Sequence, residues 1–121
     1  MDMKVTQDDD IAHVVLDGRF DIQGAQEVDA RCLALAETSD FLVVDLTKVS
    51  FIASLGVRTL MMSAKAIMRR GADMAVCGAN ENVEKVLRTT GLNEVAGLYP
   101  DFAAASAALA SRAADFAKRR P

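Results

Sequence analysis

Residues 45–71 read DLTKVSFIASLGVRTLMMSAKAIMRRG, and this stretch decides the fold of the chain. A continuous apolar run at residues 41–46 leads into it, and such a run is typical of a strand that is covered on both faces. An amphipathic helix is predicted over residues 54–70, and Gly71 ends it as glycine ends many helices. The stretch therefore predicts a buried strand that leads into a helix, with Ser54 at the helix start.

The predicted helix has two distinct faces. One is apolar with the i, i+3, i+4, i+7 spacing that should face a sheet, and it comprises Val57, Leu60, Met61, Ala64, Ile67 and Met68. The opposite stripe is basic with a methionine in the middle, and it comprises Ser54, Arg58, Met62, Lys65 and Arg69. An exposed methionine among charges resembles an interface anchor with a charged rim. Arg58, Met62, Lys65 and Arg69 are therefore predicted to bind a partner, and a solvated helix face is the alternative.

Strands and helices alternate along the whole chain. The predicted strands lie at residues 3–7, 11–16, 41–46, 73–77 and 97–99, and the predicted helices at residues 23–38, 54–70, between Asn80 and Gly91, and at 102–118. Residues 47–50 are predicted to form a turn before Phe51 and Ile52 return to the core, and Asp21 and Asn80 are predicted helix N-caps. This order predicts an α/β fold with a mixed, mostly parallel sheet of four to five strands, an antiparallel edge strand and about four helices. At this length we expect a single domain over residues 1–121.

Composition and charge exclude several classes of protein. The net charge of −3 argues against nucleic-acid binding, which usually requires a basic patch. No apolar run approaches the ~20 residues of a membrane span, and the N-terminal residues are polar, so we expect no membrane insertion and no signal peptide. Cys32 and Cys77 are isolated in apolar runs and should be buried structural thiols. These features favour a soluble protein of a reducing compartment.

No catalytic constellation can be assembled from the sequence. A Ser-His-Asp site would depend on His13 alone, because it is the single histidine, and there is no GxSxG motif. A Gly-rich phosphate loop is also missing, and no Cys/His cluster suggests a metal. We therefore predict that the protein is not an enzyme and needs neither a metal nor a cofactor.

Ser54 is the remaining candidate, and its position has two interpretations. A serine before a helix is commonly an N-cap, which contributes about 1 kcal/mol. A helix start also suits a phosphate, because its amides are unpaired and carry partial positive charge. The two interpretations are compatible, since a capping hydroxyl can also be phosphorylated.

The chain resembles the STAS domain family, in particular the bacterial anti-sigma factor antagonists. The matching runs are FIASLGV at residues 51–57, GRFD at residues 18–21, GADMAVC at residues 71–77 and, in part, Leu87 with Gly91 and Leu92. They cover nearly the whole chain in the family's order. The family usually has Asp where this chain has Ala53, and a second Ser or Thr where it has Leu55.

The resemblance implies partner switching. An antagonist binds an anti-sigma factor that is also a serine kinase, and so frees the sigma factor. The kinase then phosphorylates the serine at the helix start, which breaks the complex, and a phosphatase resets it. By residue match, Ser54 takes the place of the phosphoserine and Asp21 that of a nearby acidic residue, with Ala53, Leu55 and Gly56 beside the phosphosite.

Two other functions remain open at this stage. The chain could be a structural STAS subunit of a lipid-transport or larger signalling complex, with Ser54 acting only as a cap. A small-molecule sensor is the third possibility, and no motif supports it. The kinase, the phosphatase and the location in the cytoplasm are what the resemblance implies.

Overall fold

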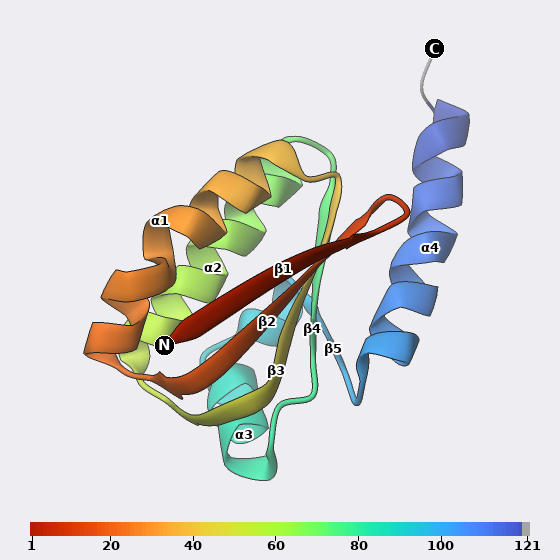
Figure 1. The fold of residues 1–121 in the computed structure, drawn as a ribbon. Coiled ribbons are helices and arrows are strands. Elements are labelled where there is room, and N and C mark those ends of the chain that lie inside the picture. Colours follow the sequence, from red (N-terminus) through yellow and green to blue (C-terminus); the bar gives the residue numbers. More distant parts are fainter. Residues whose placement is uncertain (120–121) are drawn as a thin grey trace.

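The computed structural model describes the backbone of residues 1–119 and the side chains of residues 1–112 (Figure 1). Its elements are β1 (Asp2–Asp8), β2 (Ile11–Phe20), α1 (Ile22–Thr38), β3 (Phe41–Ile52), α2 (Ser54–Arg69), β4 (Asp73–Cys77), α3 (Glu81–Thr89), the 3-10 turn η1 (Leu92–Glu94), β5 (Gly97–Tyr99) and α4 (Phe102–Arg119). Within these residues the five strands form one sheet in the order β1-β2-β3-β4-β5. The β1–β2 pair is antiparallel and the other three pairs are parallel, which confirms the predicted fold class.

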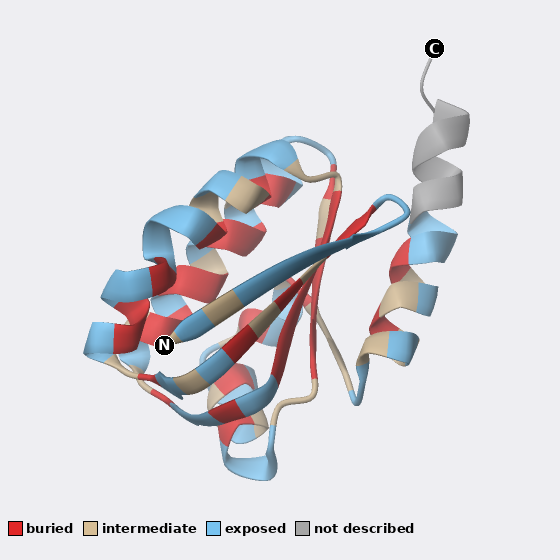
Figure 2. Ribbon diagram, viewed as in Figure 1, coloured by how far each residue is buried: buried red, intermediate tan, exposed pale blue. Residues whose placement is uncertain are grey.

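The helices form layers on both faces of the sheet (Figure 1). The larger core lies under α1, α2 and α3, where side chains such as Val28, Leu60 and Leu87 are fully buried. The smaller core lies under α4, whose Ala105 and Leu109 pack against Val43 and its neighbours. In Figure 2, β4 and the first half of β3 are buried, whereas β1 at the edge of the sheet is exposed. Coverage on both faces explains why the third strand reads as a continuous apolar run.

The strand β3 is longer than the sequence predicted. Residues 47–50 continue the strand instead of forming a turn, and they pair with the second half of β2. The pairing shifts register twice, between Val15 and Asp17 and between Gly18 and Arg19. Gly18 has φ +126°, a conformation that glycine adopts without strain. The predicted turn was wrong because Thr47, Lys48 and Ser50 were taken as turn residues, whereas they are exposed positions of a strand that continues through a register shift.

The buried face of α2 also differs from the prediction. Met68 is 48% exposed, although it was expected to face the sheet. Thr59 and Ser63 are 2% exposed instead, because they lie on the side of α2 that meets α1. Thr59 and Ser63 are four residues apart, about one helical turn, and small side chains at such positions allow two helices to pack closely. The apolar pattern alone located the sheet-facing side and missed the side that faces α1.

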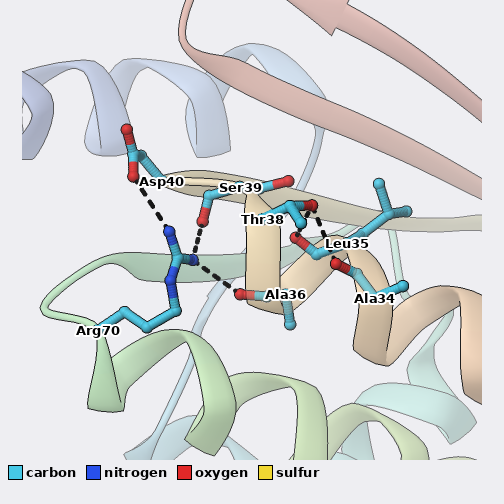
Figure 3. Close-up of polar contacts among 7 residues, drawn as sticks. All are labelled: Ala34, Leu35, Ala36, Thr38, Ser39, Asp40 and Arg70. Atoms are coloured by element: carbon cyan, nitrogen blue, oxygen red, sulfur yellow. Dashed lines mark hydrogen bonds and ion pairs between the residues drawn. The ribbon is translucent and has the colours of Figure 1, made fainter.

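Arg70 joins the ends of α1 and α2 (Figure 3). Its guanidinium donates hydrogen bonds to the Ala36 carbonyl at 2.9 Å and the Ser39 carbonyl at 2.6 Å. It also lies 3.4 Å from the Asp40 carboxylate. The carbonyls at a helix end lack partners within the helix and carry partial negative charge, so a cation there is favourable. The two helices are thus fastened together at this end, opposite their N-termini.

Candidate functional site

Ser54 is the first residue of α2, and its side chain is exposed. The residue in the N-cap position is Ala53, with φ −106° and ψ 174°, and α2 has no side-chain cap. The prediction that Ser54 caps the helix is therefore wrong. A capping side chain must come from the extended residue before the helix, and Ser54 already belongs to the first turn.

The start of α2 differs from the starts of α1 and α3. Asp21 accepts the Gly24 amide at 2.9 Å and Asn80 accepts the Val83 amide at 2.8 Å, so both predicted N-caps are confirmed. In α2 the first intrahelical bond runs from the Val57 amide to the Ala53 carbonyl at 3.1 Å. The amides of residues 54–56 precede it and have no partner within the helix. This end of α2 therefore presents donors and partial positive charge beside an exposed hydroxyl.

Gly56 fixes where α2 begins. A Cβ atom added there would lie 2.7 Å from the Phe20 carbonyl oxygen and 2.9 Å from the Phe20 ring. The Ala53 amide donates to the same carbonyl at 2.9 Å. The first turn of α2 thus packs directly on the end of β2, and this contact sets the position of Ser54. Gly56 belongs to the site as a structural support.

Asp21 lies at the same end of the sheet as Ser54. It lines an open hollow together with Ala53, the residue before the serine. Its carboxylate is engaged by the Gly24 amide and by Arg19, and these contacts lower the pKa of Asp21 below its ordinary value. Asp21 is therefore an ionised helix cap next to the site.

Leu55 points away from the exposed surface of the site. It is partly buried against the larger core and lines a groove of about 150 Å³ between α1 and α2. At this groove the Thr59 hydroxyl donates to Asp29 at 2.9 Å and contacts the Leu55 carbonyl at 3.1 Å. The Thr59–Asp29 bond joins α1 to α2 and was not expected from the sequence. Leu55 therefore contributes to packing at a position where the hydroxyl of the family's usual Ser or Thr would be half-buried.

The predicted partner stripe is exposed. Arg58, Lys65 and Arg69 reach solvent, and Met62 is 41% exposed between them. Among the residues whose side chains are described, no carboxylate forms an ion pair with these three cations. The charges of these three cations are therefore not neutralised, and they form a positive surface next to Ser54, as the sequence indicated. Its role in binding a partner stays a prediction.

His13 belongs to a separate cluster on the α4 side of the sheet. Its Nε2 donates to Asp45 Oδ2 at 2.9 Å, and its ring stacks on Phe102 with centroids 3.8 Å apart. The Thr47 hydroxyl and amide donate to the other Asp45 oxygen at 2.5 and 3.0 Å. Burial raises the pKa of Asp45, but the hydrogen bonds from Thr47 and His13 outweigh it, so the net pKa lies below the ordinary value. The histidine therefore fastens α4 to the sheet.

Both cysteines are free and buried, as expected. Burial raises the pKa of the Cys32 thiol to about 11 and that of Cys77 to about 12. Both thiols therefore stay protonated and unreactive near neutral pH. The side chains described through residue 112 contain no group of three metal-ligating residues.

Residues 2–105 match the sequence model of the STAS domain. The chain belongs to the STAS domain family. Among curated proteins, no match was found. For the described part of this STAS domain, no helix combines the length and the apolar character that a bilayer crossing requires.

Several solved structures share the fold of this STAS domain. A STAS-domain anti-sigma factor antagonist from Planctomyces limnophilus has a TM-score of 0.83 at 22% identity, covering 91% of this chain and 99% of that one. A SulP transporter STAS domain from Vibrio cholerae has a TM-score of 0.69 at 29% identity, covering 90% and 88%. The phosphorylated form of the Bacillus cell fate determinant SpoIIAA has a TM-score of 0.67 at 13% identity, covering 85% and 96%. Similar structures thus include both anti-sigma factor antagonists and a transporter domain.

Proposed function

We propose that this STAS domain is an anti-sigma factor antagonist that binds an anti-sigma factor serine kinase and is released by phosphorylation of Ser54. The observation that carries the proposal is the start of α2, where an exposed serine adjoins a helix end with no side-chain cap. The fold relatives support it, since they include named antagonists and one protein in a phosphorylated form.

A phosphate on Ser54 is compatible with the fold. The hydroxyl is exposed, and the amides of the first turn can donate hydrogen bonds to a negative group. Ala53, in the N-cap position, has no side-chain group that could occupy those amides. The modified protein should therefore keep its structure.

The same phosphate would change the surface strongly. It adds nearly two negative charges beside the positive stripe that begins at Arg58. An anti-sigma factor that binds this stripe needs an acidic patch. The phosphate neutralises the stripe and repels such a patch, so the complex dissociates without unfolding. A phosphatase that removes the group restores binding.

Incubation with the organism's anti-sigma factor kinases and ATP tests the proposal directly. Intact-mass measurement should show one added phosphate, and Ser54→Ala should abolish it. Ser50→Ala is the matched control, since Ser50 is an exposed serine on the adjoining strand, and it should leave the modification in place. An unmodified protein in every combination would contradict the proposal.

A structural role in a transporter is the second candidate. The observation that favours it is the 29% identity to the SulP transporter STAS domain. In that role Ser54 stays unmodified, and the chain co-purifies with a membrane protein. A lipid-transport or larger signalling complex would give the same two results.

A further inference from the structure

The strand β1 forms one edge of the sheet, and it is unusually open for an edge strand (Figure 1). It is 7 residues long, pairs with β2 along its whole length without a register shift, and is exposed except at Met3. The opposite edge strand, β5, has 3 residues, is followed by Pro100 and packs through Tyr99 on the core under α4. The outward amides and carbonyls of an edge strand can pair with a further strand. Of the two edges, β1 is therefore the one that can accept another strand.

Only the second half of β1 is free of α1. Arg31 on α1 donates to the Met3 carbonyl at 3.5 Å, and the Met1 amino group donates to Glu27 on α1 at 2.8 Å. The described side chains of α1 form no hydrogen bond or ion pair with residues 4–8. The side chain of Val5 is 39% exposed there. The open part of the edge is thus the run KVTQD at residues 4–8.

This run is complementary to itself in charge. Lys4 and Asp8 are exposed on the same face of the strand, because side chains alternate along it. Neither forms an ion pair among the described side chains. An antiparallel contact with its two-fold axis at Thr6 places Lys4 opposite Asp8 of a second copy, and symmetry forms this contact twice. Thr6 then lies opposite Thr6, and both kinds of cross-strand pair are stabilising.

The other registers of the same contact are less favourable. Centring it on Lys4 brings two lysines together, and centring it on Val5 places Asp2 opposite Asp8 twice. Like charges in directly opposite positions are destabilising. Centring it on Met3 pairs Asp2 with Lys4 but requires the part of the edge that Arg31 contacts. The register centred on Thr6 combines opposite charges with an open backbone.

We propose that a second copy of this chain adds to β1 in antiparallel orientation, centred on Thr6, so that two sheets join into one. The complementary charges are built into this one strand, whereas a strand of another protein would have to supply them independently. Association stops at two copies, because the edge at β5 is short and packed beside α4.

The inference goes beyond the proposed function and does not depend on it. Asp8 pairs with Ile11 at the start of β2, whereas α2 begins beside Phe20 at the end of β2. The contact therefore lies at the end of the sheet away from Ser54. Both serines of the dimer stay accessible to a kinase.

Charge reversal and complementation test the proposal. A contact of a few strand residues is small and should be weak, so sedimentation velocity is measured at protein concentrations up to about 1 mM. Lys4→Asp places like charges opposite each other twice and should raise the dimer Kd about tenfold or more, and Asp8→Lys should do the same. Lys48→Asp is the control, because Lys48 is an exposed lysine on β3 and the change in charge is equal; it should leave Kd unchanged.

An equimolar mixture of Lys4→Asp and Asp8→Lys should form the dimer again. In the mixed pair the two introduced residues face each other, and the native Asp8 of one chain faces the native Lys4 of the other. Circular dichroism checks that each variant is folded. Phosphorylation of Ser54 in Lys4→Asp should proceed at the wild-type rate, so this inference and the proposed function can fail separately.

Three results would overturn the inference. A wild-type protein that stays monomeric at every concentration would exclude the contact. A dimer that withstands both charge reversals would have its contact elsewhere on the surface. Variants that lose the dimer singly and do not recover it as a mixture would show that Lys4 and Asp8 do not face each other across a two-fold axis.

Discussion

Gly56 determines whether the first turn of α2 can sit against β2. Gly56→Ala places a Cβ atom within 2.7 Å of the Phe20 carbonyl oxygen, a backbone atom held in the β2–α2 contact. Such overpacking costs about 1–3 kcal/mol, so the free energy of unfolding should fall by that amount in urea titrations. Ser54→Ala, two residues earlier on the exposed side, should change it by less than about 0.5 kcal/mol. Equal stability of the two variants would contradict the close approach.

Single residues were predicted from sequence with mixed success. Asp21 and Asn80 were correctly identified as caps, because their side chains precede clear helical patterns. Ser54 was predicted to cap α2, but the N-cap residue is Ala53, one position earlier. Sequence patterns place helix ends only to within one or two residues. Phe51 was predicted to return to the core, but it is 40% exposed, so that prediction was wrong. The exposure of Ile22 was not predicted.

At the scale of the helices, Arg70 should matter more than its exposed neighbour. Arg70→Ala removes the donor to two carbonyls at the end of α1, and each such bond contributes about 1 kcal/mol. We expect the free energy of unfolding to fall by about 1–2 kcal/mol. Arg69→Ala is the control, since Arg69 is exposed, and its effect should stay within about 0.5 kcal/mol. If the two variants had the same midpoint in urea titrations, the stabilising role of Arg70 at the ends of α1 and α2 would be refuted.

Helix faces were partly predictable from periodicity. The sheet-facing residues of α2 were identified correctly except for Met68, because apolar spacing reports burial against a sheet. The contact with α1 includes the small polar residues Thr59 and Ser63, and hydrophobicity does not mark such residues. A stripe of small residues at helical spacing was the available signal. Arg70 gave no signal, since its partners are backbone carbonyls on another helix.

For the molecule as a whole, the Asp45 cluster should make the stability against unfolding depend on pH in the acidic range. The folded pKa of Asp45 lies below its ordinary value of about 3.9. Its contribution is therefore fully present above that value and is lost as pH falls through the lower folded pKa. Asp45→Asn should flatten the stability curve below about pH 5, measured by thermal unfolding. A variant curve that stays parallel to the wild type across this range would show that Asp45 does not contribute.

The overall architecture was predictable because strand and helix patterns alternate. Alternation predicts parallel strands with covering helices, and the five-stranded sheet of the described residues confirms this. The sequence did not show that α4 alone covers one face, nor that β3 extends to Ile52. Both depend on pairing between distant segments, which local patterns do not encode.

The exposure of Ile22 and Phe51 has an evolutionary consequence. The two side chains lie outside both cores, whereas the neighbouring Gly56–Phe20 contact holds Ser54 in place. Substitutions at Ile22 and Phe51 should therefore cost the fold little. This part of the surface can vary among related chains while the position of Ser54 stays fixed.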